Sequence, residues 1–104
     1  MLTQRQIGAV QKAFKGNAEE RMPLVFQALA DATRLKIFRL LAKQKDLCVT
    51  DIAKIFKISI PAVSYQLKIM EMVGLVRREK MGKMVCYELR KDDPFVRKII
   101  KIIN

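Results

Sequence analysis

The sequence predicts a mainly α-helical domain that carries one small β-hairpin. Three observations indicate this fold class. Apolar residues recur at helical spacing along most of the chain, residues that start or stop helices bound these segments, and one late segment reads as two strands around a glycine. At 104 residues the chain has room for one modest core, so we expect a single domain over residues 1–104.

The two ends of the chain each predict an amphipathic helix. Residues 3–15 set apolar side chains among Gln and Lys, and Gly16 follows as a stop signal. Residues 94–103 follow Asp92 and Asp93, whose negative charges favour a helix N-terminus. The apolar faces consist of Ile7, Val10 and Phe14 in the first helix, and of Phe95, Val96, Ile99, Ile100 and Ile103 in the last.

Two more helices are expected before residue 44. Pro23 fits the first turn of one, because a helix needs no N–H there, and this helix continues to Ala30. Asp31 can cap the next helix by accepting a backbone hydrogen bond. The spacing within that helix predicts a broad buried stripe of Leu35, Ile37, Phe38, Leu40 and Leu41.

A helix–turn–helix is predicted over about residues 51–73. Leu47 and Val49 alternate with Cys48, which indicates a very short strand just before it. Thr50 can cap the first helix of the pair. The core residues expected from that helix are Ile52, Ile55 and Phe56.

The second helix of the pair has two different faces. Ser59 can cap it, Pro61 suits its first turn and Gly74 can end it. Helical winding puts Val63, Leu67 and Met70 on the buried face with Ile60 beside them, and leaves Pro61, Ser64, Tyr65 and Lys68 toward solvent. An apolar back and a front of short or hydrogen-bonding groups are typical of a helix that enters the major groove of DNA.

A basic hairpin is predicted over about residues 75–90, with its turn at Gly82. Val85, Tyr87 and Leu89 should form its buried face, and Met84, Cys86 and Glu88 its other face. Residues 54–91 hold nine basic and three acidic residues, so this part of the chain is strongly positive. The order of elements predicts a winged helix–turn–helix with additional helices at both ends.

The charge balance of the whole chain indicates a polyanionic partner. Twenty-one Lys and Arg against ten Asp and Glu give a net charge of +11, and the self-repulsion of such an excess opposes compactness. Nucleic acid is the first candidate partner and an anionic membrane surface the second. A basic surface without a partner is the remaining alternative.

The same composition argues against an enzyme. The chain has no histidine and no glycine-rich phosphate-binding motif, so we expect neither a catalytic centre nor a cofactor. It has no apolar run long enough to span a membrane and no recognisable signal peptide. A cytoplasmic location without membrane association is therefore expected.

Residues 24–89 resemble the arsenic-repressor (ArsR/SmtB) family of winged-helix regulators. The similar segments read FQALADATRLKIFRLLAK, DLCVTDIAKIF and SIPAVSYQLKIMEMVGLVRREKMGKMVCYEL. The resemblance implies a homodimeric regulator that binds operator DNA, usually as a repressor. It also implies that the helices over residues 3–15 and 94–103 build the dimer interface.

The resemblance assigns the groove contacts. Family members usually carry Gln-Ser after the capping serine and Ser-His a turn later, and Ile60-Pro61 and Ser64-Tyr65 stand here, so apolar contacts replace some hydrogen bonds. Basic side chains of the hairpin would hold phosphates. The expected DNA-binding residues are Ser59, Ile60, Pro61, Ser64, Tyr65 and Lys68 on the helix, and Arg77, Arg78, Lys80 and Lys83 on the hairpin.

The metal site of many family members is incomplete in this chain. They carry Cys-x-Cys where this sequence reads LCVTD, so Cys48 is present and Thr50 replaces the second thiol. Without histidine, no set of metal ligands is expected. Cys86 lies on the second hairpin strand and could be a cross-strand neighbour of Cys48. The two could then form a disulfide that responds to oxidants, or remain two thiols in a reducing cytosol.

One alternative function is a winged-helix module that binds RNA or a protein partner through its basic hairpin. Proteins that read single-stranded RNA stack bases on exposed aromatic side chains. Here the aromatic residues mostly fall at core spacings, with Tyr65 as the exception. Double-stranded DNA is therefore the partner that the sequence favours.

Overall fold

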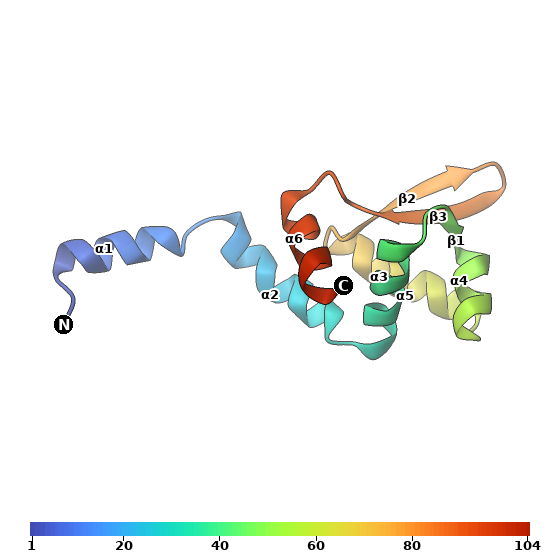
Figure 1. Ribbon diagram of the computed structural model, residues 1–104, viewed down its shortest axis with the longest axis horizontal. Coiled ribbons are helices and arrows are strands. Elements are labelled where there is room, and N and C mark those ends of the chain that lie inside the picture. The colour runs from blue at the N-terminus through green and yellow to red at the C-terminus, as the bar shows by residue number, and fades with distance from the viewer.

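The computed structural model describes the backbone of all 104 residues and the side chains of all except residues 17–19. It confirms a mainly helical chain with a three-stranded antiparallel sheet (Figure 1). The elements are α1 (Gln4–Ala13), α2 (Asn17–Leu29), α3 (Ala32–Lys43), β1 (Leu47–Cys48), α4 (Val49–Phe56), α5 (Ile60–Met72), β2 (Val76–Met81), β3 (Met84–Leu89) and α6 (Pro94–Ile103).

The sheet joins the hairpin to the segment that precedes the helix–turn–helix. Its strand order is β1-β3-β2, so β3 lies in the middle. Gly82 has a φ of 63° at the tip between β2 and β3, a conformation in which a Cβ atom would be strained. Strand β1 pairs with β3 through only two residue pairs, Leu47 with Tyr87 and Cys48 with Cys86.

The core lies between α3, α5 and the sheet, and α2, α4 and α6 also contribute to it. Phe38, Ile52, Leu67, Met70 and Val96 are all fully buried within it. Full burial of one such side chain stabilises the fold by about 1.5–3 kcal/mol. The buried face predicted for α5 is confirmed, because Val63 is fully buried together with its two partners.

Local signals fix both ends of α5. Ser59 caps its start, with the Ala62 N–H donating to the Ser59 side-chain oxygen over 3.2 Å, and Pro61 lies in its first turn. At its end Gly74 has a φ of 79°. The Gly74 and Leu75 N–H groups donate to the carbonyls of Glu71 and Met70, which is the hydrogen-bond pattern of a Schellman motif. The predicted start and stop of this helix are confirmed.

Arg21 ties three elements together at this end of α5. Its guanidinium donates to Asp93 Oδ2 over 2.6 Å and to the Gly74 carbonyl over 3.1 Å, and it lies 4.9 Å from the centroid of the Phe95 ring. Asp93 in turn caps α6 by accepting from the Phe95 N–H. Burial raises the pKa of Asp93, but the hydrogen bonds from Arg21 and Phe95 and the charge of Arg21 outweigh burial and hold that pKa below its ordinary value of 3.8.

Helix α1 extends away from the rest of the molecule (Figure 1). None of its residues is buried, and Phe14 at its end is 66% exposed. The radius of gyration is 17.1 Å, whereas a compact chain of this length has about 13 Å. Its predicted amphipathic pattern is present, but none of the residues with described side chains buries its apolar face.

Two predicted helix starts are wrong. Helix α2 begins at Asn17, so Pro23 lies inside it and not in its first turn. The missing N–H of Pro23 is tolerated because Val25 and Leu29 anchor the helix in the core. Helix α4 begins at Val49, so Thr50 does not cap it; the Cys48 N–H instead donates to Asp51 Oδ2 over 2.9 Å.

Two residues predicted to be buried are exposed. Ile55 is half exposed, because the neighbours of the short α4 cover only the arc that contains Ile52 and Ala53. Ile60 is half exposed as well, because it opens α5 beyond the core. Cys86 lies opposite Cys48 as the sequence suggested, and it is buried there because Cys48 covers it. Among the other residues predicted for the core, Leu35, Leu40, Phe56 and Val85 are half-buried and not fully buried.

Candidate nucleic-acid interface

The outer face of α5 presents small, polar and apolar groups side by side. Pro61, Ser64 and Lys68 are exposed, and Tyr65 is 65% exposed. This face is held outward because the opposite side of the helix is anchored in the core. Ile60 is exposed on this face as well, among the residues with which it was predicted to bind DNA.

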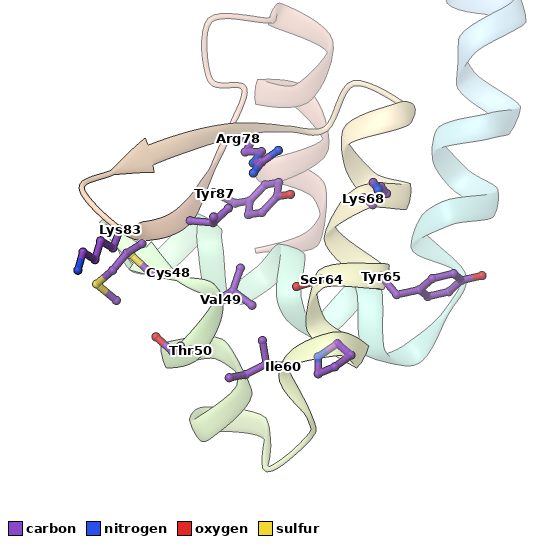
Figure 2. Close-up of a pocket in the computed structure, with 13 residues that line it drawn as sticks. Cys48, Val49, Thr50, Ile60, Ser64, Tyr65, Lys68, Arg78, Lys83 and Tyr87 are labelled. Atoms are coloured by element: carbon purple, nitrogen blue, oxygen red, sulfur yellow. The ribbon is translucent and has the colours of Figure 1, made fainter.

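A hollow of about 640 Å³ lies between α5, the start of α4 and the hairpin (Figure 2). Seven of the ten predicted DNA-binding residues line it: Ile60, Pro61, Ser64, Tyr65, Lys68, Arg78 and Lys83. The structure thus brings side chains of the helix and of the hairpin to one concave surface. Ser59, Arg77 and Lys80 do not line it.

Six further residues line the hollow: Cys48, Val49, Thr50, Met84, Val85 and Tyr87. Sequence reasoning assigned none of them to DNA contact. Thr50 was predicted to cap a helix that starts at Asp51. Because α4 starts two residues earlier, at Val49, Thr50 lies in its first turn and lines the hollow. The others required the pairing of β1 with β3, which no local pattern reveals.

The hollow is electropositive. Among its lining residues, all within the described part of the chain, three are cationic and none is acidic. Tyr87 forms part of its wall and is 8% exposed. Burial and the negative charge of Glu71 raise the pKa of the Tyr87 phenol against the opposing effect of Arg78, so Tyr87 is neutral and can donate a hydrogen bond at neutral pH.

Arg77 lies on the other face of the hairpin from Arg78. Successive residues of a strand point to opposite faces, and Arg77 pairs in register with Glu88. Its guanidinium forms ion pairs with Asp92 at 3.0 Å and with Glu88 at 3.7 Å. Lys80 shares the face of Arg78, is exposed, and lies opposite Val85. The hairpin therefore offers Arg78, Lys80 and Lys83 toward a ligand, and Arg77 is engaged within the protein.

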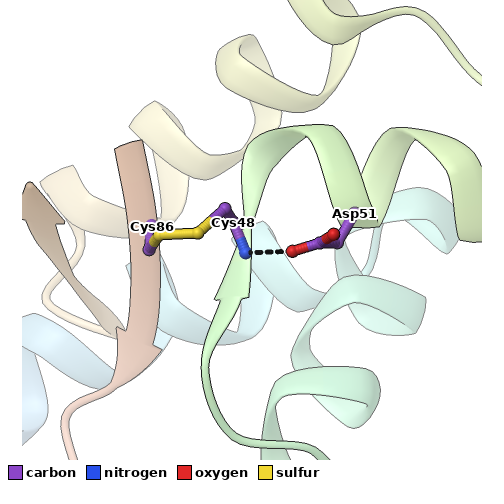
Figure 3. Close-up of a disulfide and its surroundings, with 3 residues drawn as sticks. All are labelled: Cys48, Asp51 and Cys86. Atoms are coloured by element: carbon purple, nitrogen blue, oxygen red, sulfur yellow. Dashed lines mark hydrogen bonds between the residues drawn. A yellow bond between two sulfur atoms is a disulfide. The ribbon is translucent and has the colours of Figure 1, made fainter. Parts of the chain in front are cut away.

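A disulfide joins Cys48, which lines the hollow, to Cys86, which does not. Figure 3 shows the bond between the two strands. The two cysteines are a directly opposed pair in the β1–β3 register, as the sequence suggested for their strands. Both are buried, with exposed fractions of 8% and 2%. The bond links β3 of the hairpin to the residue that precedes α4.

Among residues with described side chains, no three His, Cys, Asp or Glu lie together in a way that could hold a metal ion. Within the described chain, no helix is both long and apolar enough to cross a membrane.

The fold and the hollow define a winged helix–turn–helix domain, and comparison with known proteins identifies its family. Residues 31–78 match the family model described as "Bacterial regulatory protein, arsR family". The chain is 34% identical to an uncharacterised helix–turn–helix transcriptional regulator, MJ1325, of Methanocaldococcus jannaschii, over 82% of this chain and 93% of the relative. It is 38% identical to a homologue of the cadmium-resistance regulatory protein CadC of Staphylococcus aureus, over 74% of this chain and 62% of that protein.

A solved structure agrees with these relatives. The transcriptional repressor PagR of Bacillus anthracis superposes with a TM-score of 0.70 and 33% identity, over 82% of this chain and 94% of that one. The chain therefore belongs to the ArsR family of bacterial transcriptional regulators, which are not enzymes. It spans less than two thirds of the length of the CadC homologue.

Proposed function

We propose that this protein binds double-stranded DNA sequence-specifically, as a homodimeric transcriptional repressor. The observation that carries the proposal is the hollow, in which the outward face of α5 and the basic hairpin converge without a carboxylate among the lining residues described. An α-helix with its side chains is about 10–12 Å across and fits the major groove, which is about 12 Å wide.

The two walls of the hollow have different roles in this proposal. Exposed groups of α5 read base edges: Ser64 and Tyr65 through hydroxyls, and Ile60 and Pro61 through apolar contact with thymine methyl groups. Lys68, Arg78, Lys80 and Lys83 bind phosphates, and Ser59 lies at the start of α5 where it can do the same. Arg77 was predicted to bind phosphates too. Because it forms ion pairs with Asp92 and Glu88, we expect it to contribute least to DNA binding.

The homodimer rests on apolar side chains that this chain leaves exposed. Ile7, Val10 and Phe14 of α1 are 43–66% exposed, and Ile102 of α6 is 77% exposed. A protein of Mycobacterium bovis that shares this fold is described as a homodimeric winged helix–turn–helix DNA-binding domain. Of the α6 face predicted for the interface, Val96 and Ile99 are buried in this chain's own core, so the interface is left with the side of α6 around Ile102. Pairing of α1 and of this side of α6 with their copies would cover the exposed side chains and would place two recognition helices on one duplex. Repression is inferred from PagR, which is named a repressor.

The side chains do not fit the metal chemistry that the names of several relatives suggest. A thiolate site for a soft metal needs several free ligands, and here Cys48 and Cys86 are bonded to each other. Thr50, beside Cys48, supplies no thiol. We therefore propose a regulator without a complete metal-sensing site.

A selection of bound sequences from a random duplex pool tests this function. We expect a dyad-symmetric consensus whose half-site centres are about 10 base pairs apart, or a multiple of that. Fluorescence anisotropy should then show a steep loss of affinity with salt. Recovery of no consensus, together with equal affinity for double-stranded RNA, would instead favour the alternative of a basic hairpin that binds without reading sequence.

A further inference from the structure

We propose that Cys48 and Cys86 form a thiol–disulfide exchange site, and that its oxidised form binds DNA more tightly than its reduced form. The inference rests on the proposed DNA-binding function and adds a chemical input to it. Its reactant is a low-molecular-weight thiol or disulfide. The argument starts from where the two sulfur atoms lie.

The disulfide is placed where it can control the shape of the hollow. On one side, Cys48 is followed by Val49 and Thr50, which line the hollow from the start of α4. On the other side, Cys86 follows Met84 and Val85, which line it from the hairpin. The bond therefore ties the start of α4 to the adjoining hairpin, and it reinforces a strand pairing that consists of only two residue pairs.

Loss of the bond would loosen the hairpin relative to α4. The tip of the hairpin around Lys83 lies beyond β1 and pairs only within the hairpin itself. In the reduced protein this tip would sample more orientations, and DNA would have to order it on binding. The oxidised protein holds Arg78 and Lys83 around the hollow in advance, so it should bind more tightly.

Of the two cysteines, Cys48 is the more accessible to a reactant. Cys48 lines the hollow, whereas Cys86 does not and is 2% exposed. An incoming thiolate would therefore attack Cys48 Sγ, form a mixed disulfide there, and release Cys86 as a thiolate that takes up a proton. Lys83 and Arg78 on the walls attract the negative charge of the thiolate.

The exchange balances with a dithiol as reductant. Its first sulfur forms the mixed disulfide with Cys48, and its second sulfur displaces Cys48, so the dithiol leaves as a cyclic disulfide and both cysteines become thiols. Two electrons and two protons pass to the protein. A small disulfide in excess reverses the reaction by the same steps and leaves as two thiols.

DNA and disulfide formation are then linked thermodynamically. If oxidation strengthens DNA binding by some factor, bound DNA favours the disulfide by the same factor. We expect roughly a fivefold to tenfold difference in operator affinity, because the reduced hairpin must be ordered. A tenfold difference corresponds to a shift of about 30 mV in the midpoint potential when operator DNA is bound. DNA in the hollow would also shield Cys48 from reagents.

The test uses the full chain equilibrated in glutathione buffers of defined ratio. The chains are then alkylated and their intact mass is measured. Most chains should carry either two alkylated thiols or none, and few should carry one. Selected operator DNA should slow the alkylation. Anisotropy should show weaker operator binding by the reduced chain. The double variant C48S/C86S should bind like the reduced chain and ignore reductant, and its melting curve checks that it folds.

Several results would overturn the proposal. One is equal operator affinity of the oxidised and reduced chains, and another is tighter binding after reduction. A third is independent alkylation of the two thiols in every buffer, and this result does not depend on a folded double variant. If neither form bound any duplex selectively while the thiols still appeared as a pair, the proposed DNA-binding function would fail and the exchange site would stand.

Discussion

The two ends of this molecule are built differently. The end with the hollow is braced within one chain: α5 is capped and stopped, Arg21 holds its C-terminus, and a disulfide joins the hairpin to α4. At the other end, α1 has no buried residue and presents an apolar face. The difference indicates that one chain completes the proposed DNA-binding surface, whereas the proposed dimer interface at α1 would need a second copy.

The largest expected effect comes from the end that one chain leaves incomplete. Phe14→Glu places a charge on the apolar face of α1 and should prevent dimerisation. Loss of the second half-site contact should then weaken operator binding by roughly 100-fold. Sedimentation equilibrium measures the oligomeric state, and anisotropy the affinity. Lys15→Ala, next to it on an exposed position, lowers the net charge by the same one unit and is the control for charge. A dimer that persists in Phe14→Glu would contradict the assignment of α1.

The Arg21 clamp should have the next largest effect, on the braced end. Arg21→Ala removes the hydrogen bonds to Asp93 and Gly74 and should lower the free energy of unfolding by roughly 2 kcal/mol, because hydrogen bonds to charged groups contribute about 1.5–3 kcal/mol. Urea unfolding at pH 7 measures this. Arg5→Ala, on α1, should leave stability unchanged.

The same clamp predicts a pH dependence. The folded pKa of Asp93 is lowered, so its contribution is complete above the ordinary carboxyl pKa of 3.8 and is lost as the pH falls through the lowered value. Asp93→Asn should therefore be less stable than the parent protein at pH 7 and approach it in the most acid buffers. Parallel stability curves over that range would show that Asp93 is not involved.

The groove side of α5 should control discrimination between DNA sites. Tyr65→Ala removes an exposed aromatic side chain without disturbing the core, and should reduce the preference for the selected operator over a random duplex by roughly tenfold. The affinity for the random duplex should change little. Competition anisotropy with both duplexes measures the ratio. An unchanged ratio would remove Tyr65 from the reading surface.

The smallest effect distinguishes the two faces of the hairpin. Lys83→Ala should weaken binding to all sequences alike and reduce the slope of log affinity against log salt by about one, because one phosphate contact is lost. Arg77→Ala is the matched control: it removes the same charge from the face where Arg77 pairs with Asp92 and Glu88. If both variants changed the slope equally, the two faces of the hairpin would contribute alike to DNA binding. The side chains around the hollow would then have no special role in contacting phosphates.

The sequence by itself determined the order of the elements and most of their ends. Helix caps and tight turns depend on local backbone geometry, so they can be predicted without knowing the fold. The residues that act in this way are Ser59, Gly74, Gly82 and Asp93. The buried face of α5 could also be predicted, because helical spacing alone separates the two faces of a helix. Seven of the ten residues expected to bind DNA line the hollow.

Tertiary structure alone decided which of these residues share a surface. The register of β2 with β3 separated Arg77 from Arg78, and the packing of α4 brought Thr50 into the hollow. The sequence suggested that Cys48 and Cys86 could be neighbours, and the β1–β3 register decided that they are. Tertiary structure also decided that Ile55 and Ile60 are exposed, since neighbouring elements cover only part of each helix. Contacts between residues distant along the chain depend on packing and strand register, and no local spacing encodes them.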